Sequence, residues 1–140
     1  SNPVVGGLFN KVVAPPFAGS AVKSGLADAF SPSPVPEGYI EKADVMRAAT
    51  PAALRANSLD MISAKREVIA QQARYPEIRI PVAILAADGD TVVSPTIHSL
   101  KLAQTLSNAR LDVVQGSGHL PHEAAPERLA KLVDWVQAAK

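Results

Sequence analysis

Two residues of this sequence, Asp90 and His119, have side chains that can work together as acid and base. Asp90 ends the turn at 88–90 (DGD), and His119 ends the turn at 116–119 (GSGH). A neutral imidazole can take a proton from a hydroxyl group, and an aspartate beside it holds the ring in the required tautomer and stabilises the imidazolium ion. The residue types therefore indicate acid–base catalysis, provided that the fold brings the two turns together.

The segments around these turns are predicted to form a strand, a helix, a second strand and a second helix. Residues 80–87 (IPVAILAA) are a continuous apolar run, typical of a parallel strand covered on both faces. Ser94 is a suitable cap for a helix over 94–106, and the alternation at 110–115 predicts a strand with one wet face. A terminal helix is expected over 126–138.

This order of elements is that of a βαβ unit, whose right-handed crossover makes the two strands parallel. Both turns then leave the sheet at the same edge, and adjacent strands are only about 4.8 Å apart. We therefore expect Asp90 to lie close to His119, at the edge where open α/β sheets bind their ligands. Asp88 competes with Asp90 for this role, but it lies nearer to the strand and we interpret it as a turn residue.

The first half of the chain is predicted to be helical and rich in turns, because most of the 12 prolines lie there. An apolar segment at 4–13 precedes a helix at 20–30 and a short helix at 37–49. A long helix follows to about residue 73, with Thr50 as its N-cap. The sequence thus predicts a helical segment at residues 1–76 and an α/β segment at residues 77–140.

Composition argues against several classes of protein. The net charge of +1 and the lack of basic clusters give no sign of nucleic-acid binding. The lack of cysteine excludes disulfides and fits a cytoplasmic location, and no apolar run approaches the roughly 18 residues of a membrane span. His122 and Glu123 follow His119 closely, but two histidines in a His-x-x-His spacing with one carboxylate, outside a helix, are only a weak indication of a metal site. We expect neither a metal nor an organic cofactor, and no membrane contact.

The predicted sheet is incomplete. Two parallel strands do not form a stable sheet on their own, and the apolar run at 80–87 suits a strand with neighbours on both sides. The chain supplies only one of these neighbours. We expect the other to come from a missing N-terminal core segment or from a second copy of the chain.

Residues 80–95 (IPVAILAADGDTVVSP) and 109–136 (ARLDVVQGSGHLPHEAAPERLAKLVDWV) together resemble the C-terminal part of an α/β-hydrolase. In that family a Gly-x-x-Asp turn carries the acid of the catalytic triad, and a Gly-x-Gly-His turn carries the base. The resemblance implies that Asp90 is the acid and His119 the base. Ala87 departs from the usual Gly, and Ser94 from the usual Pro. The helical segment before residue 76 more loosely resembles the cap of this family.

The resemblance implies a hydrolase of hydrophobic ester-like substrates that acts through a Ser-His-Asp triad. The nucleophilic serine of the family lies in a Gly-x-Ser-x-Gly elbow, which this sequence lacks. The nucleophile is therefore expected upstream, and the chain alone is expected to be inactive. Two alternatives stay open: an Asp nucleophile, as in dehalogenases and epoxide hydrolases, or a non-catalytic binding or assembly module with the same fold.

Overall fold

The computed structural model describes residues 14–139 of the chain, and their side chains from residue 19 on. The chain divides into two compact units. The described part of the first unit extends to Leu26 and continues at Val35–Ala70, while the second unit contains Ala27–Pro34 and the chain from Gln71 on. The predicted apolar segment at 4–13 lies outside the described residues. The assignment of residues 1–76 to a cap stays a prediction.

The first half of the chain is helical, as predicted, but its helices have different limits. Its elements are α2 (Ala14–Phe30), α3 (Tyr39–Lys42), the 3₁₀ helix η2 (Val45–Ala49) and α4 (Pro51–Gln72). Helix α2 begins before residue 20 because Pro15 and Pro16 fall in its first turn, where a missing N–H breaks no hydrogen bond. The predicted helix at 37–49 is interrupted because Asp44 adopts a left-handed conformation with φ 48°.

The predicted start of the long helix is confirmed. The Ala53 N–H donates to Thr50 Oγ1 at 3.3 Å, which satisfies one of the amide groups that the first turn leaves without a partner. Within residues 14–139, no helix has the length and apolar character that a membrane span requires.

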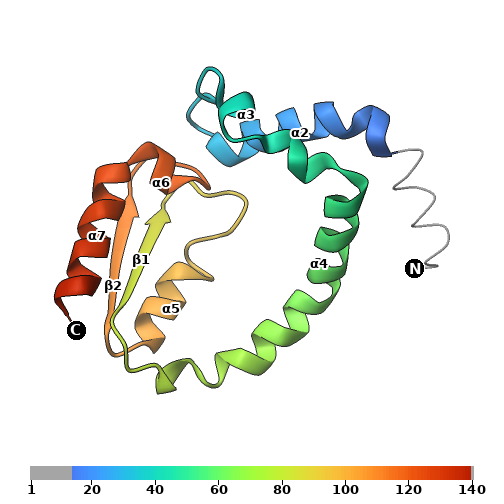
Figure 1. Cartoon of the computed structure of the whole chain (residues 1–140). Helices are drawn as coiled ribbons and strands as arrows, with labels where there is room; N and C mark the ends of the chain where they lie inside the picture. Colours follow the sequence, from blue (N-terminus) through green and yellow to red (C-terminus); the bar gives the residue numbers. More distant parts are fainter. Residues whose placement is uncertain (1–13, 140) are drawn as a thin grey trace. The chain divides into compact units, whose positions relative to one another are not determined.

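The second unit contains a parallel pair of strands, β1 (Val82–Ala87) and β2 (Ala109–Val114). Their connection includes α5 (Ser99–Thr105), and the chain continues through α6 (Pro121–Ala124) and α7 (Pro126–Ala138). Both arrows point the same way in Figure 1, and the strands lie between α5 and α7. The predicted α/β class with a parallel strand–helix–strand–helix order and an incomplete sheet is confirmed, since the described residues form two strands only.

The cover over the sheet is thinner than the sequence predicts. Only the last two residues of β1, Ala86 and Ala87, are buried, whereas the four before them are half-buried. On α7, Leu132 is buried, but Leu129 and Val133 are 40% and 46% exposed. The expectation that β1 is covered on both faces is therefore met only in part: the strands lie between α5 and α7 (Figure 1), but four of the six residues of β1 stay half-buried.

Two local predictions around the sheet need correction. The helix expected from Ser94 begins at Ser99, after a turn over residues 95–98. The His98 N–H bonds to Ser94 O at 3.2 Å, but the regular series is then broken, since the Leu100 N–H bonds to Pro95 O at 2.9 Å. That spacing of five residues is wider than an α-helical hydrogen bond. The loop expected at 116–122 ends early, since Pro121 starts the single turn of α6 and its fixed φ suits the first helical position.

Candidate active site

The strand register brings the two predicted turns to the same level. Ala87, the last residue of β1, pairs with Val114, the last residue of β2. Because the strands are parallel and end in register, residues 88–90 and 115–119 leave the same edge of the sheet side by side. This edge is the carboxyl end of both strands, as predicted.

Asp90 uses both oxygens of its carboxylate. Oδ1 accepts hydrogen bonds from the backbone N–H groups of Val92 (2.9 Å) and Val93 (2.8 Å), which fixes the side chain in its own turn. Oδ2 lies 2.9 Å from Nδ1 of His119. The carboxylate is thus held by its own loop on one side and presented to the imidazole on the other, and its side chain is only 12% exposed.

Asp90 is ionised at neutral pH. Burial alone would raise the pKa of its carboxyl group, but the hydrogen bonds from Val93, His119 and Val92 together outweigh this, and the pKa lies below the ordinary value of 3.8. An ionised carboxylate can only accept hydrogen bonds, so Nδ1 of His119 carries the proton that joins the two groups. In the neutral ring, Nε2 then keeps its lone pair and can act as a base.

The lowered pKa predicts a loss of stability in acid. The unfolded chain binds the proton on Asp90 more readily than the folded chain does, so the contribution of Asp90 is complete above pH 3.8 and is lost as the pH falls through the lower pKa of the folded state. Urea unfolding of the wild type and of Asp90→Asn at a series of pH values measures this effect. The difference between their free energies of unfolding should shrink as the pH falls below 3.8; a constant difference would contradict the assignment.

Further hydrogen bonds join the two turns between the strand ends and the Asp90–His119 pair. The Asp88 carboxylate accepts from the Gly116 N–H at 2.7 Å, and the Gly89 N–H donates to Ser117 O at 3.0 Å. Asp88 therefore bonds to the backbone of the histidine turn, while Asp90 bonds to the imidazole. The link from Asp88 to Gly116 could not be predicted from the sequence, because a contact between residues 28 apart depends on the strand register.

The histidine turn also packs closely on the segment Ala27–Pro34, which belongs to the same compact unit. A Cβ atom added at Gly118 would overlap the carbonyl oxygen of Ser31 and lie 2.9 Å from that of Ala29. Phe30, which stands between Ala29 and Ser31 in the sequence, is buried. Gly118 is thus required for the close approach of two backbone segments, and residues 27–34 support the turn that carries the imidazole.

Gly118→Ala is expected to destabilise the chain by about 1–3 kcal/mol, because backbone must shift to admit the methyl group. Gly25→Ala is a matched control: Gly25 lies inside α2 with open space around it, and alanine there should stabilise the helix by about 0.5–1 kcal/mol. Urea unfolding of both variants measures the two effects. Equal stability of Gly118→Ala and the wild type would contradict the described packing.

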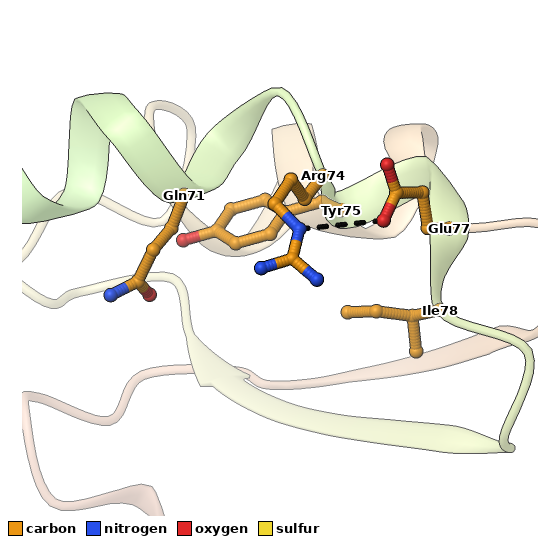
Figure 2. A pocket seen from close by; sticks show the side chains of 5 residues that line it. All are labelled: Gln71, Arg74, Tyr75, Glu77 and Ile78. Carbon is orange, nitrogen blue, oxygen red and sulfur yellow. Dashed lines mark hydrogen bonds and ion pairs between the residues drawn. The ribbon is translucent and has the colours of Figure 1, made fainter.

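A shallow hollow lies away from the two turns, on the segment that leads into β1. It measures about 440 Å³ and is lined by Gln71, Arg74, Tyr75, Glu77 and Ile78 (Figure 2). The Arg74 guanidinium is paired with the Glu77 carboxylate at 3.4 Å, and both side chains are exposed. Neither Asp90 nor His119 lines this hollow, so the candidate site rests on the strand-end turns and not on the hollow.

The sequence matches the model of the alpha/beta hydrolase family over residues 3–132. No curated protein and no solved structure matches it. The family match includes both strand-end turns, and it also extends through most of the helical segment before residue 76, where the resemblance is looser.

Proposed function

Because the chain belongs to the alpha/beta hydrolase family, we propose that Asp90 and His119 are the acid and the base of a hydrolase triad. The observation that carries this proposal is the 2.9 Å contact between Asp90 Oδ2 and His119 Nδ1. It is supported by the position of both residues at the carboxyl edge of two parallel strands and by the lowered pKa of Asp90, which keeps its carboxylate ionised.

In the proposed reaction, Nε2 of His119 accepts the hydroxyl proton of a serine nucleophile as the serine oxygen attacks the ester carbonyl carbon. The electron pair of the carbonyl moves to its oxygen and returns when the bond to the leaving alcohol breaks. His119 gives its proton to that alcohol, and an acyl-enzyme remains. Water then repeats the sequence and releases the acid. Asp90 keeps Nδ1 protonated throughout and stabilises the imidazolium ion.

We propose that the nucleophile comes from a segment that adds a strand beside β1. Three observations support this: the 140 residues contain no Gly-x-Ser-x-Gly, β1 pairs with β2 alone among the described residues, and most of β1 is only half-buried. An unpaired strand edge favours the addition of another strand. A second copy of this chain could cover the edge, but it would bring no serine elbow and would leave the triad incomplete.

The proposed substrate is an ester with a hydrophobic acyl group. Val92 and Val93, two and three residues after Asp90, are 53% and 38% exposed, although apolar side chains of this size are usually buried. They can supply apolar contact area next to the acid–base pair. As the family resemblance implies, the helical segment at residues 1–76 would form the lid of the pocket.

The test uses a polypeptide that contains both these 140 residues and the segment with the proposed nucleophile strand. A fluorophosphonate probe, which reacts with activated serines, should label it, and it should hydrolyse p-nitrophenyl esters. Hydrolysis of haloalkanes or epoxides without labelling would indicate that the nucleophile is an Asp and not a serine. Folded protein that shows neither labelling nor any of these activities would overturn the proposal in favour of a binding module.

A further inference from the structure

The side chain of Asp88 continues the link between the two strands beyond the point where the strands end. The Asp88 N–H donates to Val114 O at 3.2 Å, as in strand pairing. The Asp88 carboxylate then reaches one step further and accepts from the Gly116 N–H at 2.7 Å. The Gly89 N–H donates to Ser117 O at 3.0 Å. These bonds form a series that leads from the strands to the pair of Asp90 and His119.

The bond from Asp88 reaches a glycine of the histidine turn that has open space where a side chain would begin. Gly116 adopts a left-handed conformation with φ 67°, and a Cβ atom added there would meet nothing within 4 Å. Glycine has more accessible backbone conformations than any other residue. The charged acceptor that Asp88 supplies forms a stronger hydrogen bond than a neutral group does. It fixes the Gly116 amide three residues before the imidazole.

We infer that Asp88 is a positioning residue for His119: through Gly116 it holds the histidine turn at the level where Nδ1 of the ring meets Asp90. This inference rests on the proposed roles of Asp90 and His119. It assigns the two aspartates of the DGD turn different tasks, with Asp90 setting the protonation of the ring and Asp88 setting the place of the turn that carries the ring. Removal of the Asp88 acceptor should therefore change the state of an imidazole that Asp88 itself does not bond.

The test is nuclear magnetic resonance of the full 140-residue chain, wild type and Asp88→Ala, at about pH 9, where imidazoles are neutral. Imidazole ¹⁵N shifts report which ring nitrogen of His119 carries the proton, and amide exchange reports the freedom of Gly116. In the wild type we expect the Nδ1–H form. In Asp88→Ala we expect a mixture with the Nε2–H form and exchange at Gly116 about tenfold faster.

Asp88→Asn is the conservative variant, because its amide oxygen can still accept from Gly116. It should keep most of the Nδ1–H form of His119, with a smaller Nε2–H fraction than in Asp88→Ala, because its neutral acceptor is weaker than a carboxylate but is still present. Asp134→Ala, which removes an exposed carboxylate from α7, is the matched control and should change neither signal. An unchanged His119 tautomer in folded Asp88→Ala would overturn the inference. Equal imidazole ¹⁵N shifts of His119 in Asp88→Ala and Asp88→Asn would overturn it too, because the charge of Asp88 and not its hydrogen-bond acceptor would then be responsible.

If Asp88→Ala does not fold, Asp88→Asn carries the test alone, because its neutral acceptor is weaker than a carboxylate. Faster exchange at Gly116 together with a small new Nε2–H signal would support the inference, and an unchanged ring or unchanged exchange would overturn it. None of these measurements uses a substrate. Failure of ester hydrolysis therefore counts against the proposed function, whereas an unchanged tautomer counts against the role of Asp88.

Discussion

His119→Ala should lower kcat of the catalytically complete enzyme by about 10⁴–10⁶-fold and leave KM within a few-fold of the wild type. The imidazole is proposed to accept the proton of the nucleophile and to protonate the leaving group, and both transfers occur in the transition state. Alanine cannot carry out either proton transfer, whereas the affinity for the ground-state substrate should change little. Steady-state hydrolysis of a p-nitrophenyl ester gives kcat and KM separately.

His122→Ala is the matched control for this experiment. His122 lies three residues further along, its side chain is 49% exposed, and its Nε2 is 3.8 Å from the carboxylate of Glu123. Loss of this imidazole should change kcat by less than a few-fold. Comparable losses in the two variants would show that the region matters for folding and not that His119 acts as the base. Full activity of His119→Ala would remove the residue from the mechanism.

Asp90→Asn should lower kcat by about 10⁴-fold, through the tautomer of the histidine. The amide oxygen of the variant can keep the hydrogen bonds from the N–H groups of Val92 and Val93, since these groups can only donate. The –NH₂ group then faces Nδ1 of His119, which must become an acceptor. The ring proton moves to Nε2, and the nitrogen that should take the proton of the nucleophile is already occupied.

Two measurements on Asp90→Asn separate this explanation from a general loss of structure. Imidazole ¹⁵N shifts should show the Nε2–H form of His119 in folded protein, and ester hydrolysis should show the fall in kcat. Asp134→Asn, an exposed change of the same kind on α7, should leave both unchanged. If folded Asp90→Asn keeps the Nδ1–H form and most of its kcat, the aspartate is not the acid of the triad.

The parallel strand order and the common edge of the two turns could be predicted from the amino-acid sequence alone. The reason is that these features depend on local patterns: an uninterrupted apolar run, turn residues at its end, and a crossover long enough for one helix. The proximity of Asp90 and His119 follows from that order, and the structure places their side chains 2.9 Å apart. The cap at Thr50 is likewise local, since an N-cap bonds to an amide of its own first turn.

The contacts that hold the two turns in place could not be predicted and are known only from the folded chain. The bond from Asp88 to Gly116 and the packing of Gly118 against Ser31 join residues that are far apart in the sequence, so they depend on register and on the path of the chain. Local patterns carry no information on either. The incomplete cover of β1 has the same origin, because an apolar run shows that a strand is suited to burial, but the segments that pack against it decide how far it is buried.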